Sequence, residues 1–342
     1  MSNKMREGLA YSDVLLVPQY SDIKSRNEVK LASNLSDNQF RLPIIASPMD
    51  TVSEKDMVVA MADEGGLSII HRYNTIEEQI KIVESSRASL VNPDSPVAAA
   101  IGTSGDYLER AVALVGHGAK ILCVDVAHGH HVLMKQALQE LRGIVRDTVH
   151  IMAGNVATLE GYNDLVDWGA DSVRCNIGGG SICSTRIQTG HGVPGLHTII
   201  DCARSDRGVP IVADGGIRNS GDIVKALAAG ADFVMLGSLL SGTDETPGDV
   251  INTREGKFKA YRGMASKDAQ VEWRGKTSSL EGIATTVPCK GPVFDILKEL
   301  ERGIRSGLSY SGARNIEELQ AKARFIRQTS SGQTESGTHI LR

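Results

Sequence analysis

The sequence predicts a single domain folded as an α/β TIM barrel, the (β/α)8 architecture. Three observations predict this fold class. Eight short apolar runs recur along the 342-residue chain, most of them continuous, as in strands buried on both faces of a parallel sheet. Helical stretches separate most of the runs, and glycine is plentiful at 36 residues, which suits many short strand-to-helix turns. The predicted strands are residues 43–46, 67–70, 97–101, 120–124, 149–152, 171–174, 209–213 and 233–236.

The segments between these runs mostly carry apolar residues at helical spacing. Clear examples are residues 76–84, 107–116, 132–145, 159–168 and 220–229. Strands that alternate with helices imply right-handed crossovers, and eight such units close most economically into a barrel. A doubly wound open sheet is the alternative, but no GxGxxG turn follows an early strand, which disfavours a dinucleotide-binding fold of that kind.

Three segments lie outside the repeating units. Residues before Leu42 are expected to form a lead-in with a small hairpin. Residues 242–291 are polar and punctuated by glycine, which predicts a mobile flap over the active face. The tail, residues 328–342, is rich in Ser, Thr and Gly and is expected to be disordered unless a neighbour orders it. None of these segments resembles a separate domain, so residues 1–342 are expected to form one.

Composition excludes several classes of function. The formal net charge of −4 is spread along the chain, with no basic stripe of the kind that nucleic-acid binding requires. The longest apolar runs, such as residues 233–240, fall short of the roughly 20 residues that span a bilayer. The first residues lack the apolar core of a signal peptide, so a cytoplasmic protein is expected. The five cysteines form no CxxC pair, which argues against a disulfide framework or a zinc ribbon.

The loop after the sixth predicted strand, residues 176–186, is the strongest candidate for chemistry. It is rich in glycine and presents the thiol of Cys183 beside two hydroxyls and the guanidinium of Arg186. Glycines let the backbone approach a ligand closely, and nearby N–H groups or a cation favour the nucleophilic thiolate. A buried structural thiol is the alternative interpretation, but this setting favours a nucleophile.

Two further glycine turns follow the seventh and eighth predicted strands, at Asp214-Gly215-Gly216 and Gly237-Ser238. Each is expected to stand immediately before a helical stretch. Backbone N–H groups at a helix start bind phosphate well, and TIM barrels commonly hold phosphate after these two strands. The hydroxyls of Ser181 and Ser238 are expected to add hydrogen bonds.

The loop after the fourth predicted strand contains Asp125 and three close histidines, His128, His130 and His131. A zinc site is one interpretation, but no carboxylate or second histidine pair follows at the spacing of helical ligands. A loop that contacts substrate or cofactor is preferred, and Asn155, after the fifth strand, is expected to share that role.

Four motifs together resemble the IMP dehydrogenase and GMP reductase family. They are Ser47-Pro-Met-Asp-Thr-Val52, Gly180-Ser-Ile-Cys183-Ser-Thr185, Asp214-Gly-Gly-Ile217 and Tyr261-Arg-Gly-Met264. They appear in barrel order, and the resemblance runs from about Gly8 to Glu335. It implies that the cysteine attacks C2 of a purine nucleotide and forms a covalent thioimidate, which links hydride chemistry at C2 to water or ammonia chemistry.

The family has two branches, the dehydrogenases and the reductases, which catalyse this chemistry in opposite directions. Typical dehydrogenases carry regulatory nucleotide-binding (CBS) modules after the second strand, but residues 71–97 hold only one helix-sized connector. They also carry an Arg-Tyr pair on the flap, whereas residues 261–291 contain Trp273-Arg274-Gly-Lys276 and no such pair. Both features favour a reductase. The Ser47-Pro48 pair, Arg174 where reductases favour Lys, and the tail Glu335-Ser-Gly337 resemble the dehydrogenase instead.

The resemblance therefore implies an NADPH-dependent GMP reductase that forms IMP and ammonia, expected as a homotetramer. Cys183 is the implied nucleophile, with Thr185 and Glu281 assisting proton transfer to the leaving amine. The implied substrate contacts are Ser47, Met49, Arg174, Ser181, Asp214, Gly215, Gly216, Gly237, Ser238, Tyr261, Gly263 and Met264. The implied cofactor contacts are Asp125, Ala127, His128 and Asn155. A potassium site is implied at Gly178, Gly180 and Cys183, completed by Glu335, Ser336 and Gly337 of an adjacent subunit.

Two alternatives remain. One is an IMP dehydrogenase without its regulatory modules, which would use NAD and potassium; the other is a nucleotide sensor that binds no cofactor. The chain also departs from the family in the cysteine loop. Gly179 stands where Pro or Ser is usual, and Cys175-Asn176 stands where a Val-Gly pair is usual.

Overall fold

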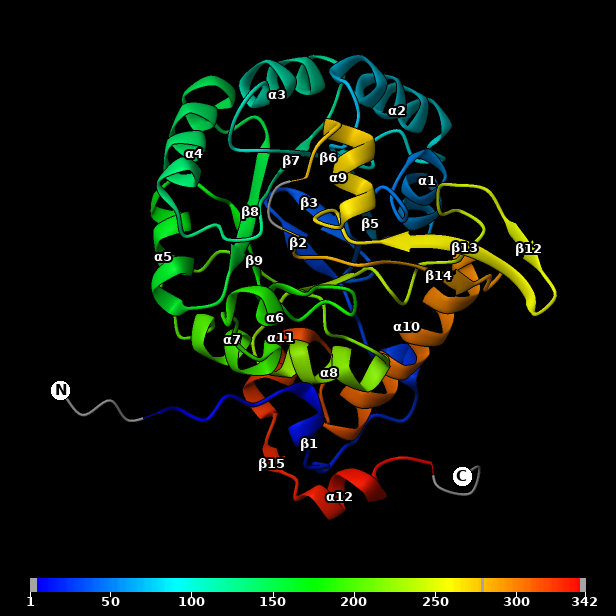
Figure 1. Cartoon of the computed structure of the whole chain (residues 1–342). Helices are drawn as coiled ribbons and strands as arrows, with labels where there is room; N and C mark the ends of the chain where they lie inside the picture. The colour runs from blue at the N-terminus through cyan, green and yellow to red at the C-terminus, as the bar shows by residue number, and fades with distance from the viewer. Residues whose placement is uncertain (1–4, 278–279, 339–342) are drawn as a thin grey trace.

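The computed structural model describes residues 5–277 and 280–338, and at its centre lies a closed barrel of eight parallel strands (Figure 1). The ring closes because β11 pairs with β4 and β10 pairs with β9, both in parallel register. The strands are β4 (Ile44–Ala46), β5 (Leu67–Ile70), β6 (Ala98–Ile101), β7 (Ile121–Asp125), β8 (His150–Val156), β9 (Ser172–Cys175), β10 (Ile211–Asp214) and β11 (Phe233–Leu236). Each predicted run overlaps one of these strands, so the barrel is confirmed and the open sheet is wrong.

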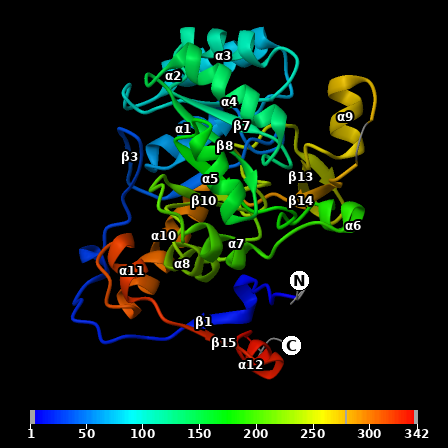
Figure 2. The same ribbon diagram turned by 90° about the vertical axis from the view of Figure 1, so that its left-hand side faces the viewer.

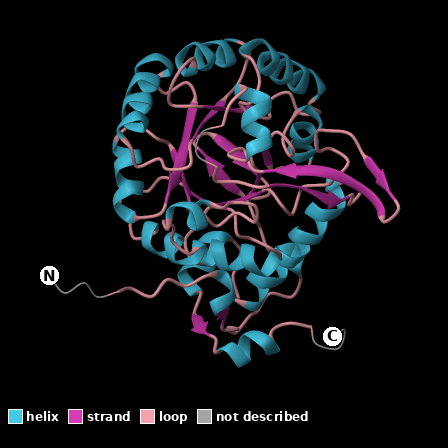
Figure 3. Ribbon diagram, in the orientation of Figure 1, coloured by secondary structure: helices cyan, strands magenta, loops and turns pink. Residues whose placement is uncertain are grey.

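A ring of helices surrounds the barrel (Figure 3). Its members are α1 (Lys55–Asp63), α2 (Ile76–Ser89), α3 (Tyr107–Gly116), α4 (Val132–Val145), α5 (Leu159–Asp167), α7 (Gly195–Cys202), α8 (Ser220–Ala228) and α10 (Val293–Tyr310). Local signals start several of them. Thr75 and Glu78 form a capping box at α2, and the side chains of Thr158 and Asn219 cap α5 and α8. Residues 71–97 contain only α2 and its two loops, as the sequence predicted.

The core has two layers, as a barrel requires. The inner layer fills the barrel with side chains from alternate strand positions, among them Ile45, Cys123, Met152 and Phe233. The outer layer lies between the strands and the helices and contains the apolar faces of both. Because the interior is packed with side chains, the barrel is a scaffold, and a site is expected at one of its ends.

The amino end of the barrel is closed by a hairpin of β2 (Ser33–Leu35) and β3 (Asn38–Phe40), which confirms the predicted lead-in hairpin. Leu35 and Phe40 are buried and belong to the inner core layer. The Phe40 ring meets the Phe233 ring edge to face, with centroids 5.6 Å apart. The short helices η1 (Tyr11–Asp13) and η2 (Arg26–Glu28) lie in the same lead-in.

The flap lies at the other end of the barrel (Figure 2). It contains an antiparallel sheet of β12 (Ile251–Thr253), β13 (Gly256–Arg262) and β14 (Ala284–Pro288), together with α9 (Lys267–Arg274). A buried lysine, Lys259 on β13, donates from Nζ to the carbonyls of Thr243, Asp244 and Thr246 at 2.7–3.1 Å. The root of the flap is thus tied to the loop that follows β11. Its mobility stays a prediction.

The tail is more ordered than its composition predicts. β15 (Phe325–Arg327) pairs antiparallel with β1 (Val14–Leu16), and α11 (Ile316–Lys322) precedes it. The side chain of Gln328 donates to the carbonyls of Ser12 and Val14, and Thr329 caps α12 (Ser330–Glu335). The lead-in segment and a local cap thus order the start of the tail, which meets the condition that a neighbouring segment orders it; residues 339–342 lie outside the described part. None of the described helices is long and apolar enough to cross a membrane.

Candidate active site

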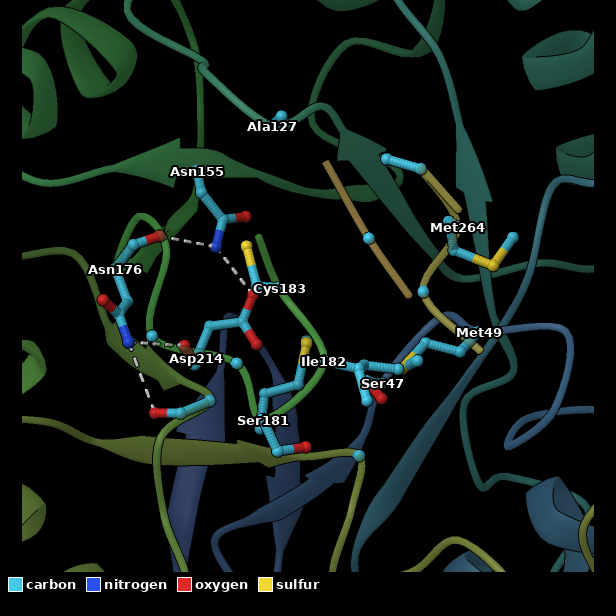
Figure 4. Close-up of a pocket in the computed structure, with 18 of the residues that line it drawn as sticks. Ser47, Met49, Ala127, Asn155, Asn176, Ser181, Ile182, Cys183, Asp214 and Met264 are labelled. Atoms are coloured by element: carbon cyan, nitrogen blue, oxygen red, sulfur yellow. Dashed lines mark hydrogen bonds between the residues drawn. The ribbon is translucent and has the colours of Figure 1, made fainter. Parts of the chain in front are cut away.

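A cavity of about 340 Å³ opens at the carboxyl ends of the strands, within the range that small ligands occupy. It is lined by the loops after β4, β5, β7, β9, β10 and β11, by Asn155 near the end of β8 and by the flap. All predicted catalytic and substrate-contacting residues line it, and so do the predicted cofactor residues except His128. Figure 4 shows Cys183 beside Asn155 and Asp214, with Met49 and Met264 across from them. The structure thus brings residues from widely separated parts of the chain to one place.

A thiol, a hydroxyl and a carboxylate form a hydrogen-bonded chain in this cavity. Cys183 is partly exposed and donates from Sγ to Thr185 Oγ1 at 3.2 Å. Thr185 in turn donates from Oγ1 to Glu281 Oε2 at 2.8 Å. Thr185 is also the first residue of the short helix α6 (Thr185–Thr189), which directs its side chain back toward the cysteine loop. A proton can therefore travel between the thiol and a carboxylate through one hydroxyl.

Backbone pairing between the flap and the cysteine loop brings Glu281 to this position. The Ser184 N–H donates to the Glu281 carbonyl at 2.9 Å, and the Ile283 N–H donates to the Ile182 carbonyl at 3.0 Å. These two hydrogen bonds flank an isolated antiparallel β-bridge between Cys183 and Gly282. Glu281 lies 96 residues beyond Thr185 along the chain, so only the folded flap places them together.

Glycine turns form the far end of the cavity. Gly215 and Gly216 follow β10 with φ of 80° and 76°, a conformation that favours glycine. Gly237 follows β11, where a Cβ would lie 3.1 Å from both Ser47 Oγ and Tyr261 Oη. Tyr261 is buried, and burial raises the pKa of its hydroxyl, which keeps it a neutral donor.

One expectation about these turns is wrong. Gly237 and Ser238 are not followed by a helix in the described chain. The N–H groups of Leu240 and Ser241 both bond to the Gly237 carbonyl, which makes a tight turn, and the chain then enters the flap. The flap is thus inserted between β11 and α10, the ring helix that follows it.

A buried guanidinium joins two carboxylates on the cavity floor. Arg174 donates to Asp125 Oδ1 at 2.5 Å and from Nη2 to Asp214 Oδ2 at 2.8 Å. Asn155 Nδ2 also donates to Asp214 Oδ2, at 2.7 Å. Burial alone would lower the pKa of Arg174, but Asp214, Cys123 and Asp125 together raise it well above its ordinary value. Arg174 thus stays charged and fixes the two carboxylates in place.

Three polar residues that line the cavity were not among the predicted site residues, namely Arg72, Tyr73 and Asn176. Arg72 lies two residues after the end of β5 and donates to the Asp125 carbonyl at 3.1 Å. Tyr73 donates from its hydroxyl to the Met264 carbonyl at 2.7 Å, and its ring stacks on Trp273 of α9 at 6.1 Å between centroids. Asn176 begins the cysteine loop. The position of Arg72 and Tyr73 shortly after a strand is the signal that could have found them.

The three histidines of the loop after β7 do not line the cavity, although Val126 and Ala127 of the same loop do. The side chain of His128 is largely exposed. Partial desolvation and the nearby histidines 130, 131 and 191 lower its pKa. His130 Nε2 lies 2.8 Å from Asp164 Oδ2, and the His131 side chain caps α4. Among the described residues, no group of three or more His, Cys, Asp or Glu side chains could hold a metal ion. The role of His128 toward a cofactor stays a prediction.

The predicted potassium residues lie in two places. Gly178, Gly180 and Cys183 share the cysteine loop, whose carbonyl oxygens belong to the ligand class that potassium takes. Glu335, Ser336 and Gly337 lie at the end of α12 and do not line the cavity. The loop already carries a cation, because Arg186 donates to the carbonyls of Ile177 and Val193. The potassium site and its completion by an adjacent subunit stay predictions.

The fold and this geometry define a class, namely TIM-barrel proteins with a cysteine in a glycine-rich loop at the carboxyl end. Residues 8–339 match the model of the IMP dehydrogenase / GMP reductase domain. The chain belongs to the IMP dehydrogenase / GMP reductase family of oxidoreductases, which act in purine metabolism.

Similar proteins carry both names. An inosine-5′-monophosphate dehydrogenase of Nitrosopumilus maritimus is 35% identical over 473 aligned positions, which cover 98% of this chain and 99% of the relative. A GMP reductase of Leishmania major is 34% identical, and the alignment covers 98% of this chain and 97% of the relative. Both alignments are longer than this chain, so these relatives contain segments that it lacks.

Among solved structures, a cysteine-to-alanine variant of GMP reductase from Trypanosoma brucei, in complex with guanosine 5′-monophosphate, superimposes with a TM-score of 0.93. It is 34% identical, and the match covers 99% of both chains. The names of the relatives leave the direction of the reaction open.

Proposed function

We propose that this protein is a GMP reductase, which uses NADPH to convert GMP into IMP and ammonia. The hydrogen-bonded chain from Cys183 through Thr185 to Glu281 is the observation that carries this proposal. A reductase must protonate an amine as it leaves C2, and a carboxylate linked to the nucleophile through one hydroxyl can do so. Substrate recognition follows from the cavity around this chain.

The nucleotide lies along the cavity with its phosphate at the glycine turns. The N–H groups of Gly216, Gly237 and Ser238 and the hydroxyls of Ser181 and Tyr261 donate to the phosphate oxygens. Asp214 Oδ2 accepts the hydrogen bonds from Arg174 and Asn155. Its other carboxylate oxygen, Oδ1, accepts from the ribose hydroxyls. Met49 and Met264 pack against the purine, where their flexible side chains fit a flat ring. This orientation places C2 over Cys183.

The thiol proton takes part in both halves of the first step. Cys183 passes its proton through Thr185 to Glu281, and Sγ forms a bond to C2 of GMP. The relay then runs in reverse and delivers that proton to the 2-amino group, so the C2–N bond breaks and ammonia leaves. The product is a thioimidate between Cys183 and C2, with no net gain or loss of electrons. Reduction is still required to reach IMP.

The second step needs a hydride at C2. NADPH, when bound, supplies that hydride. The residues fit such a group in the half of the cavity lined by Arg72, Asp125, Ala127 and Asn155, where Arg72 Nε is buried and has no hydrogen-bond partner among the described residues. Once C2 is reduced, the C2–S bond breaks, Sγ leaves as the thiolate and IMP is released. Arg72 and Asp125 hold the cofactor side of the cavity in shape.

An IMP dehydrogenase that uses NAD and potassium is the second candidate. The carbonyls of Gly178, Gly180 and Cys183 favour it, because they offer potassium oxygen ligands that the tail of a neighbouring subunit in a homotetramer would complete. Such an enzyme must activate water to hydrolyse the thioimidate. Arg274 and Lys276 are the bases that the flap sequence offers for this task, and the side chain of Arg274 lies outside the described part.

A cofactor assay on the purified protein separates the two candidates. GMP with NADPH is offered in one reaction, and IMP with NAD and potassium in another. Oxidation of NADPH with release of one ammonia per turnover, lost in Cys183→Ala, is the expected result. Reduction of NAD in the second reaction alone would overturn the reductase and assign water activation to the flap. Potassium titration of the active reaction then reports whether a cation site contributes.

A further inference from the structure

We propose that Asn176 is a positioning residue that clamps the cysteine loop (residues 176–183) to the phosphate turn (Asp214–Gly216). We infer further that residue 179 is glycine because Asn176 occupies the space that a side chain there would need. Residues 176 and 179 therefore form one interdependent pair. The proposal rests on the proposed function only in treating the phosphate turn as part of a nucleotide site.

The side chain of Asn176 binds the backbone of the phosphate turn. Its Nδ2 donates to the Asp214 carbonyl at 3.0 Å and to the Gly215 carbonyl at 3.3 Å (Figure 4). Its own carbonyl accepts a hydrogen bond from Asn155 Nδ2 at 3.0 Å, and its N–H donates to the Val156 carbonyl at 2.9 Å. Asn176 thus connects the carboxyl ends of β8, β9 and β10, the three strands that present Asn155, the cysteine loop and Asp214.

The backbone of Asn176 adopts a conformation that usually requires glycine. Its φ is 154°, where a Cβ crowds the neighbouring peptide and only glycine is free of that strain. Its Oδ1 is buried without a hydrogen-bond partner among the described residues, which adds a desolvation cost. Glycine at this position would avoid both costs. The two hydrogen bonds to the phosphate turn are the favourable interactions that offset them.

Gly179 lies directly against this amide. A Cβ at residue 179 would lie 2.8 Å from both Cγ and Oδ1 of Asn176 and closer still to Nδ2. The φ of Gly179 is not positive, so its own backbone does not call for glycine. The three heavy atoms nearest to that Cβ all belong to Asn176. A side chain at position 179 would therefore clash with the amide of Asn176 before it met any other residue.

The pair has a direct consequence for the thiol. Residues 176 and 179 precede Cys183 in the same loop, and the Cys183 N–H is held by the Gly180 carbonyl at 3.1 Å. A displaced Asn176 would shift Gly179, and with it the Gly180–Cys183 turn, away from the phosphate turn. Gly216 packs closely against the same loop, because a Cβ added there would lie 3.1 Å from the Gly179 carbonyl oxygen. The clamp therefore sets the distance between the thiol and the phosphate donors.

A double-mutant cycle tests the pair with three variants: Asn176→Gly, Gly179→Ser and Asn176→Gly/Gly179→Ser. Two readouts are followed in each protein. One is the affinity for GMP and IMP by calorimetry, and the other is the rate at which iodoacetamide alkylates Cys183, measured by mass spectrometry of its peptide. Gly143→Ser is the matched control for Gly179→Ser, because Gly143 likewise lacks a positive φ but a Cβ there meets no atom within 4 Å.

Strong non-additivity is the expected result. Gly179→Ser should weaken nucleotide binding by about tenfold or more, because overpacking displaces the loop. Asn176→Gly should weaken it by about three- to tenfold through the lost hydrogen bonds. The double variant should return to within about threefold of Asn176→Gly, and the alkylation rates should follow the same order. If the loss of affinity in the double variant equalled the product of the losses in the two single variants, the pairing would be overturned.

Asn176→Asp separates the hydrogen bond from the space it fills. It keeps the size of the side chain but replaces the donor with a carboxylate that faces two carbonyls, so nucleotide binding should be at least as weak as in Asn176→Gly. Wild-type affinity in Asn176→Asp, with an unchanged melting temperature, would overturn the clamp. If the wild-type protein bound neither nucleotide, the proposed function would fail, while the alkylation rates would still decide the pairing.

Discussion

The two ends of the barrel are built from the same eight strands but from opposite kinds of residue. At the amino end, Leu35 and Phe40 from the hairpin complete the apolar interior. At the carboxyl end, glycine turns, two carboxylates and a buried guanidinium surround an open cavity. Figure 2 shows the hairpin and the flap on opposite sides of the barrel. One end is therefore filled to stabilise the fold, and the other is kept open and polar.

This difference teaches how the barrel separates stability from chemistry. Polar groups at the carboxyl end are held by one another, as in the Arg174 network, and contribute little apolar burial. Apolar side chains at the amino end contribute burial and no chemistry. Changes at the carboxyl end should therefore reduce turnover with little loss of stability, and changes at the amino end should do the reverse. Each prediction below tests that separation.

The largest effect is expected in the proton relay at the carboxyl end. Glu281→Gln removes the carboxylate that accepts from Thr185, so ammonia release from GMP should slow by about 10²- to 10⁴-fold. The melting temperature should stay near the wild-type value, because no apolar core is lost. Glu272→Gln is the matched control, since Glu272 is an exposed flap carboxylate that pairs with Arg262. Equal turnover in the two variants would remove Glu281 from the reaction.

At the amino end, Phe40→Ala should have the reverse effect. Phe40 is 4% exposed and packs against Phe233, so its removal should lower the free energy of unfolding by about 3–5 kcal/mol. Urea unfolding measures this loss. Phe294→Ala on α10 is the control, because Phe294 is 48% exposed. The turnover of the folded Phe40→Ala protein should be close to wild type, and a large fall would show that the two ends are coupled.

The amino end should also carry a dependence on pH. His150 accepts or donates hydrogen bonds with Ser36 at 2.8 Å and Ser172 at 2.7 Å, and burial lowers its pKa to about 4, with Arg142 adding to the shift against the opposing effect of Asp171. Because the folded pKa lies below the ordinary value, the unfolded chain binds the proton more readily. The contribution of His150 to the free energy of unfolding is therefore fully present above about pH 6.5. The free energy of unfolding falls by up to about 3 kcal/mol as the pH drops toward 4.

Melting temperatures of wild type and His150→Gln between pH 4 and 7 measure this contribution. The variant lacks the titrating ring, so its stability should fall less steeply over this interval, and the two curves should converge toward pH 4. Parallel curves would assign the acid sensitivity to other groups.

The sequence predicted the barrel well because its strands are short, buried and continuous. The bounds of β5 and β11 match their predicted runs, and those of α3 and α4 match their predicted helices. The helices α1 and α7 were not named, since α7 contains Thr198, Ile199 and Ile200, β-branched residues that also suit a strand. The flap sheet has no apolar alternation, and all three residues of β12 are exposed, so only pairing with β13 defines it.

The candidate site was predictable where each residue follows a strand. Cys183, Asp214 and Gly237 were found on that ground, and the barrel brings them together. Arg72 follows a strand too, but a single charged residue is common at such a position. The dependence of Gly179 on Asn176 could not be found, because it lies in the distance between a missing Cβ and a side-chain amide. Local spacing in a sequence does not carry that distance.

The smallest effect is expected where the flap meets the phosphate end of the cavity. Lys290 donates from Nζ to the carbonyls of Ser238 at 2.8 Å and Leu239 at 3.1 Å, and burial lowers its pKa. Lys290→Met should raise the Michaelis constant for the nucleotide by about two- to fivefold, because it loosens the turn that holds Ser238 while its partners stay solvated. The maximal rate and the melting temperature should change little.

Lys257→Met is the control for this prediction, since Lys257 is exposed on β13 and lies outside the cavity lining. A fall in the maximal rate of Lys290→Met at unchanged Michaelis constant would contradict the assignment, because it would place the effect on the thiol rather than on the phosphate turn. A rise confined to the Michaelis constant would show that the flap contributes to nucleotide binding through its root. The carboxyl end would then consist of two parts, a relay that governs rate and a lysine-held turn that governs affinity.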